Sequence, residues 1–283
     1  MENQAINNHV IIVGINKGND ELFHYEMKEM ENLCAALELE VVSTIVQNLD
    51  SPVSSTYLGK GKLEEVKIYA EELNVAYVVF NDELSPVQFK NITNTIQTPC
   101  FDRTMLILEI FKIRARTKEA VLQVELAELK YQLPRLAGSY TDVSRLGGGG
   151  SGSGGARRGA GETKLELDRR HIEKRISKLK TDLLEIVQAR GVSRKSRSAN
   201  EIPIVALVGY TNAGKSSTMN TILSLFNDNT DKEVFVKDML FATLETSTRQ
   251  VKLPNNKTFL LTDTVGFVSK LPHHLVESFK STL

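Results

Sequence analysis

The stretch GYTNAGKSS, residues 209–217, decides the fold of the last part of this chain. It has the spacing G-x-x-x-x-G-K-S, and the apolar run at 204–208 stands directly before it. A glycine-rich turn between a strand and a helix lets backbone N–H groups converge on phosphate oxygens. The sequence therefore predicts a P-loop at the carboxyl end of a strand in an α/β domain.

The side chains of this loop predict which atoms meet a nucleotide. Lys215 is expected to reach the terminal phosphates, and the Ser216 hydroxyl is expected to ligate Mg²⁺. The helix that begins at Lys215 adds the positive end of its dipole. We predict nucleotide contacts for the whole motif: Gly209, Tyr210, Thr211, Asn212, Ala213, Gly214, Lys215 and Ser216.

A second anchor lies in TFLLTDTVG, residues 258–266. Its apolar strand delivers Asp263 to the carboxyl end, where parallel sheets bind their ligands. We expect Asp263 to hold Mg²⁺ through water and the amide of Gly266 to approach the terminal phosphate. The predicted nucleotide contacts of this segment are Asp263, Thr264, Val265 and Gly266.

The segment FATLETSTR, residues 241–249, lies between the two anchors. A nucleotide switch needs a hydroxyl that joins the metal only when the third phosphate is present. Several threonines compete for this role, and their spacing alone does not choose among them. We assign no catalytic residue from the sequence.

Residues 1–104 alternate between strand and helix patterns. Short apolar runs at 9–14, 41–46 and 75–80 predict buried strands, and amphipathic stretches between them predict helices. This alternation is typical of a small parallel sheet with helices packed against it. We therefore predict an N-terminal α/β subdomain over 1–104.

Two heptad stripes follow. One runs over 105–136 and the other over 162–189, and each predicts one long helix that needs a partner of the same period. They predict an antiparallel helical hairpin over 105–190, with a glycine-rich tip at 147–161. Gly191 is expected to end the second helix as a C-cap, before a linker at 191–200.

Charge is unevenly distributed along a chain whose formal net charge is zero. Residues 1–100 carry 15 acidic and 6 basic side chains, whereas 101–197 carry 12 acidic and 21 basic ones. Clustered Lys and Arg release condensed counterions when they meet phosphates, so the middle of the chain predicts a polyanion partner. A bare glycine tip suits a crowded RNA pocket better than a protein groove. The predicted RNA contacts are Arg157, Arg158, Arg169 and Arg170.

Composition excludes other classes of protein. No apolar run is long enough to span a bilayer, and the N-terminus has no basic residue followed by an apolar core. Cys34 and Cys100 are widely spaced and predict two free thiols rather than a disulfide or a metal pair. We expect a cytoplasmic protein that acts as a monomer.

On these motifs the chain resembles the HflX family of ribosome-associated GTPases, over essentially its whole length. The final unit carries the resemblance in GYTNAGKSS, FATLE, DTVGF and LPHHL. The rest carries it in YLGKGK at 57–62, NDELSP at 81–86, QVELA at 123–127 and GETKLE at 161–166.

The resemblance implies a binding partner and completes the site. It implies GTP as substrate with Mg²⁺ as cofactor, and a hairpin tip that enters the large (50S) ribosomal subunit and contacts its rRNA. It selects Thr243 as the second hydroxyl on Mg²⁺, alongside Ser216. It also adds nucleotide contacts from the FATLE segment: Phe241, Ala242, Thr243, Leu244 and Glu245.

The sequence departs from the family pattern at several places. Glu245 stands where the family usually has Asp, and the tip is even richer in glycine. The chain ends at Leu283 without the family's guanine-reading motif, so we expect 201–283 to be an incomplete P-loop GTPase domain. Phe267 follows Gly266, where many GTPases carry a water-positioning Gln, and this predicts slow turnover unless a partner orders the site.

Three functions follow from these patterns. The first is a ribosome-binding GTPase that splits or rescues ribosomal particles. The second is an RNA- or ribosome-binding module whose nucleotide site is inactive or does not select guanine. The third, a P-loop ATPase of another class, is disfavoured by the DTVG motif and by the threonine-rich segment before it.

Overall fold

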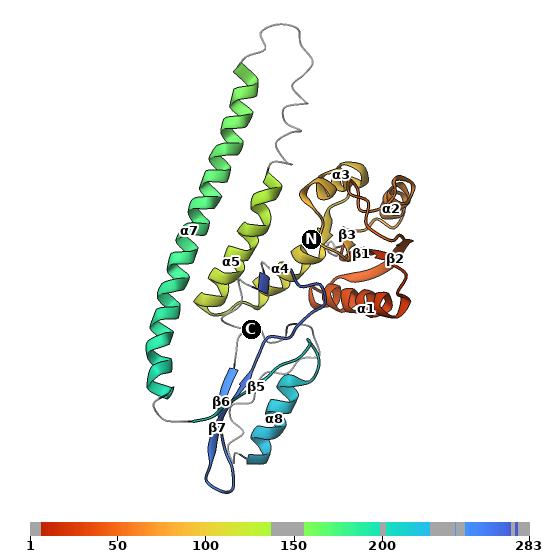
Figure 1. Ribbon diagram of the computed structural model, residues 1–283. Coiled ribbons are helices and arrows are strands. Elements are labelled where there is room, and N and C mark those ends of the chain that lie inside the picture. The colour runs from red at the N-terminus through yellow and green to blue at the C-terminus, as the bar shows by residue number, and fades with distance from the viewer. Residues whose placement is uncertain are drawn as a thin grey trace, which may run out of the picture. The chain divides into compact units, whose positions relative to one another are not determined.

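The computed structural model describes residues 7–136, 156–198, 202–226, 241, 247–272 and 275–276, with the side chains of 156–163 and 189–198 excepted. The chain divides into two compact units. The first comprises Met1–Ile107 and Glu128–Ile176, and the second comprises Leu108–Ala127 and Ser177–Leu283. Both contain a sheet and helices, which confirms the predicted mixed α/β class (Figure 1).

The first unit is built on a parallel sheet. Its strands are β1 (His9–Asn16), β2 (Glu40–Asn48), β3 (Tyr77–Phe80) and β4 (Cys100–Asp102), in the order β2-β1-β3-β4. β1 pairs in parallel with both β2 and β3, and four successive residues of β1, from Val10 to Val13, are fully buried. A strand covered on both faces needs apolar side chains in both directions, which explains the unbroken apolar run.

Three helices cover this sheet: α1 (Asp20–Ala36), α2 (Lys60–Glu72) and α3 (Pro86–Ile96). α2 and α3 lie on one side and α1 lies on the other (Figure 1). α3 begins with a capping box, because the Ser85 side chain accepts from the Gln88 amide while the Gln88 side chain accepts from the Ser85 amide. The predicted N-terminal lobe of strands and helices is therefore present in the first unit.

Buried polar contacts connect this lobe to the segments that follow it. Arg103 is 1% exposed and donates hydrogen bonds to Glu29 and to Asn81, the latter at 2.8 Å. Asp102, at the end of β4, is fully buried and accepts hydrogen bonds from the hydroxyl of Tyr131 at 2.6 Å and from the Leu84 amide at 3.0 Å. Burial raises the pKa of the Asp102 carboxyl, and these two donors oppose the rise.

The first heptad stripe does not form one long helix, so the prediction for 105–136 was wrong. The structure has α4 (Arg103–Arg114), α5 (Lys118–Gln132) and a 3₁₀ turn η1 (Leu133–Arg135). The break has a local cause, because the Thr117 side chain accepts a hydrogen bond from the Ala120 amide at 3.2 Å and so caps a new helix. Pro134, which has no N–H to donate, lies in the closing turn.

The second stripe lies on α7 (Ala156–Ser198), the long helix of Figure 1. Leu167 and Leu184, which lie outside the stripe, are 54% and 61% exposed. The stripe side chains are all buried or half-buried, as the heptad spacing predicted: Leu165, Ile172, Ile176, Leu179, Leu183 and Ile186. Antiparallel packing of two helices over 105–190 remains a prediction.

Two boundaries of the predicted hairpin were wrong. α7 begins at Ala156, so the glycine-rich tip does not extend to residue 161, and residues 147–155 lie outside the described part of the chain. α7 also continues through Gly191 to Ser198, so Gly191 is not a C-cap and the linker at 191–200 is mostly helical. A glycine inside a helix lowers helix stability by about 1 kcal/mol relative to alanine. This loss is small beside the hydrogen bonds and contacts of a 43-residue helix.

The second unit contains a three-stranded sheet in the order β5-β7-β6. β5 (Ile204–Leu207) pairs in parallel with β7 (Thr258–Asp263), and β6 (Ser247–Lys252) pairs with β7 in the antiparallel sense. Helix α8 (Lys215–Phe226) packs on this sheet through a small core that buries Met219, Val251 and Leu261.

Candidate nucleotide-binding site

Two adjacent strand ends define the candidate site. β5 and β7 are parallel neighbours, and Leu207, the last residue of β5, pairs with Asp263, the last residue of β7. Carboxyl ends of parallel strands meet at one edge of a sheet, so the segments that follow them lie together. The P-loop follows β5 and the DTVG segment follows β7, which brings the two predicted anchors to one place.

The P-loop backbone takes conformations that its sequence permits. Gly214 has φ +81° and Asn212 has φ 58°, both in the left-handed region that glycine and asparagine tolerate best. These turns lead directly into α8, whose first residue is Lys215. The predicted strand–loop–helix context of the motif is therefore present.

Lys215 bends back over this loop. Its ammonium donates hydrogen bonds to the carbonyl oxygens of Tyr210 at 2.6 Å and Gly209 at 3.1 Å. Burial lowers the pKa of Lys215, and the negative charge of Asp263 opposes that change. The ammonium thus lies on the loop whose amides would meet a phosphate.

The oxygen atoms at the strand edge fit a magnesium ion. The Ser216 hydroxyl donates to Oδ2 of Asp263 at 2.5 Å, and the Asp263 side chain is fully buried. Thr264, next in the chain, donates its hydroxyl to the carbonyl oxygen of Leu207 at 2.7 Å, which ties the DTVG segment to the end of β5. One hydroxyl and one carboxylate held this close are the hard oxygen ligands that Mg²⁺ prefers.

Gly266 lies against the P-loop itself. A Cβ added at Gly266 would come within 2.6 Å of the Thr211 Cα and 2.7 Å of the Thr211 nitrogen, closer than real contacts allow. Beside it, the Thr211 amide donates to the Phe267 carbonyl at 2.8 Å, and the Phe267 amide donates to the Gly209 carbonyl at 3.0 Å. Only glycine permits this approach.

Sequence reasoning did not find the backbone bridge between Phe267 and the P-loop. The two hydrogen bonds of Phe267 involve only its N–H and its carbonyl, which every residue except proline carries. No side-chain pattern could have revealed them. Gly266 is the visible signal in the sequence, and its motif predicts an approach to the phosphate but not the approach to the P-loop.

The segment between the anchors is described at one residue of the FATLE motif. Phe241 is 2% exposed and has φ 52°, an uncommon conformation for an aromatic residue. The other predicted contacts of this motif, among them the predicted metal ligand Thr243, lie outside the described residues: Ala242, Thr243, Leu244 and Glu245.

Of the four predicted RNA contacts, two have described side chains. Arg169 and Arg170 are about two-thirds exposed on α7, and each forms an ion pair on its own helix, with Glu173 at 2.9 Å and Glu166 at 2.8 Å. Exposed pairs of this kind contribute little and exchange readily with other anions. Arg157 and Arg158 lie in the first turns of α7, where side chains are not described.

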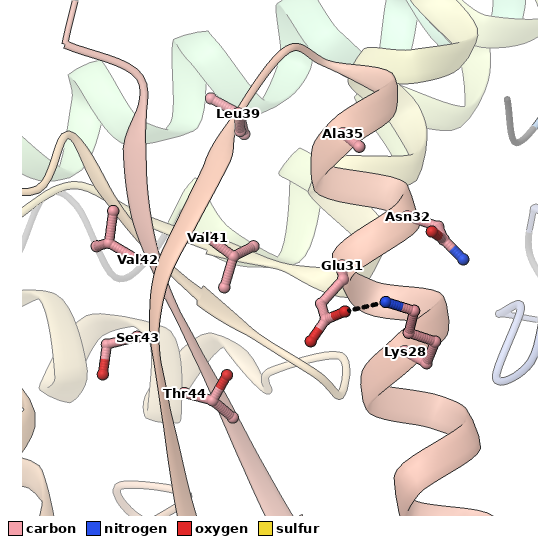
Figure 2. A pocket seen from close by; sticks show the side chains of 9 residues that line it. All are labelled: Lys28, Glu31, Asn32, Ala35, Leu39, Val41, Val42, Ser43 and Thr44. Carbon is pink, nitrogen blue, oxygen red and sulfur yellow. Dashed lines mark hydrogen bonds and ion pairs between the residues drawn. The ribbon is translucent and has the colours of Figure 1, made fainter.

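A separate open groove lies in the first unit, between α1 and β2 (Figure 2). It measures about 620 Å³, and the Lys28–Glu31 ion pair stands at its rim. None of the predicted nucleotide or RNA contacts lines it.

Within the described ranges, no helix combines the length and the apolar character that crossing a bilayer requires.

Comparisons with known proteins divide the chain in three. Residues 24–112 match the family described as GTP-binding GTPase N-terminal, and residues 114–197 match the GTP-binding GTPase Middle Region. Residues 204–283 match the family described as 50S ribosome-binding GTPase.

Curated relatives match over most or all of the chain. The GTPase HflX of Lacrimispora saccharolytica is 45% identical over 283 residues, which is 100% of this chain and 64% of the relative. The GTPase HflX of Caldanaerobacter subterraneus subsp. tengcongensis is 46% identical over 97% of this chain and 60% of the relative. The chain therefore spans less than two thirds of the length of these relatives.

A solved structure shares the fold. The crystal structure of SsGBP in complex with GDP aligns with 98% of this chain and 68% of its own, with a TM-score of 0.55 and 25% sequence identity.

Proposed function

The chain belongs to the HflX family of GTPases, and from this premise we propose that it binds GTP with Mg²⁺, hydrolyses it, and associates with the large ribosomal subunit. The observation that carries the proposal is the meeting of two motifs at one sheet edge. Ser216 and Asp263 are 47 residues apart in the chain, yet their oxygens lie 2.5 Å apart, directly beside the P-loop.

Each residue of the proposed site has a role in nucleotide binding. The backbone amides of the P-loop donate hydrogen bonds to the phosphate oxygens, and the helix dipole of α8 favours their negative charge. Lys215 leaves the carbonyl oxygens of Gly209 and Tyr210 to meet the terminal phosphates. Ser216 and Thr243 would hold Mg²⁺ through their hydroxyls, and Asp263 would hold it through water.

Hydrolysis proceeds by in-line attack of water on the terminal phosphate. When bound, Mg²⁺ neutralises the charge that develops on the phosphate oxygens. Phe267 stands directly after Gly266, and a phenyl ring cannot orient or polarise a water molecule. Intrinsic turnover is therefore slow, and a partner that orders the site accelerates it.

The helical part of the chain supplies the RNA-binding surface. α7 exposes a series of cationic side chains, and the ion pairs of Arg169 and Arg170 among the described residues are exposed. They can exchange these carboxylates for rRNA phosphates and release counterions in doing so. We place Arg157 and Arg158, nearer the glycine-rich tip, in the same interface. Cytoplasmic action in ribosome splitting or rescue fits this arrangement.

The alternative is an RNA- or ribosome-binding module whose nucleotide site is inactive or does not select guanine. It is not favoured, because the Ser216–Asp263 contact and the close approach of Gly266 to Thr211 bring the two phosphate- and metal-binding motifs together at one sheet edge. The two functions differ in two measurable quantities, the rate of GTP hydrolysis and the affinity for GTP relative to ATP.

Titration of the chain with fluorescent GTP, GDP and ATP, with and without Mg²⁺, tests the proposal. We expect Mg²⁺-dependent binding that favours guanine nucleotides, and faster hydrolysis when purified 50S subunits are added. Lys215→Ala should abolish nucleotide binding and leave salt-sensitive association with 50S subunits intact. Equal affinity for ATP and GTP, or no binding of either, would contradict the proposal.

A further inference from the structure

An aromatic pair in the second unit joins helix α4 to the first residue of the FATLE motif. The rings of Phe111, on α4, and Phe241 have centroids 4.7 Å apart and an interplanar angle of 86°, an edge-to-face arrangement. Each side chain is 2% exposed, so each ring is buried. The residues are 130 positions apart in the chain, and both belong to the unit that contains the P-loop.

Phe241 has a backbone conformation that needs support. Its φ of 52° lies in the left-handed region, where a bulky side chain is disfavoured. Such a conformation persists only when the surroundings hold it in place. Within the described part of the chain, the buried ring of Phe111 is a contact that can hold Phe241 in place.

The position of Phe241 connects this contact to nucleotide chemistry. Phe241 opens the FATLE motif, and two residues after it stands Thr243, to which the proposed function assigns a hydroxyl on Mg²⁺. A hydroxyl of this kind contributes only when the third phosphate is present. Displacement of Phe241, which directly precedes the other residues of the motif in the chain, would therefore weaken GTP binding and hydrolysis more than GDP binding.

We propose that Phe111 is a positioning residue for the nucleotide site, and that it acts through the ring of Phe241. The inference rests on the proposed function and deepens it, because it assigns a role in GTP hydrolysis to a residue of helix α4, outside the matched 50S ribosome-binding GTPase region at 204–283. A substitution in α4 would then change the affinity for GTP and the rate of its hydrolysis.

The test uses the whole chain and compares two positions on one helix. Phe111→Leu keeps an apolar side chain but removes the aromatic edge, whereas Ile113→Ala alters a side chain that is 64% exposed on the same helix. We expect Phe111→Leu to lower kcat and the GTP-to-GDP affinity ratio by about 3- to 10-fold, the usual scale of one aromatic pair. Affinity for GDP should stay within about twofold, and Ile113→Ala should match the unaltered chain in all three quantities.

A second measurement reports the contact itself. The chain has no tryptophan, so Phe241→Trp introduces a single fluorophore at this position. Its emission should be that of a buried indole, and adding Phe111→Ala should shift the emission to the red and raise quenching by acrylamide. Adding Ile113→Ala instead should leave both unchanged.

The outcomes separate the two proposals. If the unaltered chain binds no GTP, the proposed function fails and this inference fails with it. If the chain binds GTP but Phe111→Leu leaves kcat and the GTP-to-GDP ratio unchanged, the inference alone is overturned. An indole at position 241 that remains equally buried after Phe111→Ala would also overturn it.

Discussion

The hydroxyl of Ser216 donates to Oδ2 of Asp263 at 2.5 Å, although one residue lies in the first turn of α8 and the other ends β7. The parallel pairing of β5 and β7 brings them together, because it places the segments after both strands at one sheet edge. This contact joins two motifs whose contacting residues lie 47 positions apart in the chain.

Substitution of either partner should remove the metal dependence of nucleotide binding. For Ser216→Ala and Asp263→Asn we expect GTP affinity to fall at least 10-fold in Mg²⁺ and to approach the value measured in EDTA, since a ligand of the ion is lost. Fluorescent nucleotide titration with and without Mg²⁺ measures this. Ser217→Ala, at the next position, is the matched control, and an equal loss in that variant would contradict the assignment.

Gly266→Ala tests the close approach of the DTVG segment to the P-loop. The added Cβ would lie 2.6 Å from the Thr211 Cα, a backbone atom that cannot move aside cheaply. We expect the two segments to separate and GTP hydrolysis to fall by about 10-fold or more, in a single-turnover assay.

The control for this variant is Gly61→Ala, in the first turn of α2. A Cβ at Gly61 would meet nothing within 4 Å, so that variant should keep its activity and its thermal stability. Wild-type hydrolysis by Gly266→Ala would mean that the contact between Gly266 and Thr211 does not exist in solution.

How much of this site was predictable depends on the kind of signal each residue gives. The P-loop and Asp263 were identified because their chemistry demands particular residues at fixed spacing beside an apolar strand. The backbone hydrogen bonds of Phe267 could not be predicted, because they use no side chain. The Phe111–Phe241 pair could not be predicted either, because its residues are 130 positions apart in the chain.

The fold shows the same division. The parallel sheet of the first unit could be predicted from unbroken apolar runs. A strand buried on both faces needs such a run, and strands of parallel sheets are buried in this way. The break between α4 and α5 did not follow from the heptad spacing, because a stripe of leucines continues across it. One capping hydroxyl, that of Thr117, decided a boundary that seven-residue periodicity could not reveal.

The two cysteines should be chemically inert while the lobe is folded. Burial raises the pKa of both Cys34 and Cys100 from 9.0 to about 12, so thiolate is scarce at pH 8. Iodoacetamide at that pH should label neither thiol until urea unfolds the lobe, as mass spectrometry would record. Rapid labelling of the native chain would contradict their burial.

The same pKa shifts predict how stability depends on pH. The folded-state pKa is above the unfolded value, so the two thiols leave stability unchanged below about pH 9 and lower it as the pH rises toward 12. Replacement of both cysteines by alanine should remove this part of the alkaline destabilisation, measured as the urea midpoint at pH 8 and pH 10.

Arg103 should be among the most sensitive positions of the first unit. It is 1% exposed and pairs with Glu29, which is itself buried, so Arg103→Met leaves a carboxylate without its main counter-charge. Loss of one partner of a buried pair costs about 3–5 kcal/mol, which urea unfolding would detect. The double variant Arg103→Met/Glu29→Met should be less destabilised than Arg103→Met alone, and the opposite order would contradict this explanation.

The cationic face of α7 can be tested without disturbing the nucleotide site. Arg169→Gln/Arg170→Gln removes two exposed guanidinium groups whose only described ion pairs are with Glu173 and Glu166 on the same helix. If both arginines contact rRNA phosphates, affinity for 50S subunits should fall, and the slope of log K against log salt should decrease by about one per lost contact. Lys17→Gln/Lys28→Gln removes the same charge from exposed positions in the acidic N-terminal part of the chain and should change neither quantity. Equal losses of affinity for 50S subunits in the two double variants would show that net charge, and not the face of α7, governs the association. Unchanged GTP binding by both variants is the control that the P-loop is undisturbed.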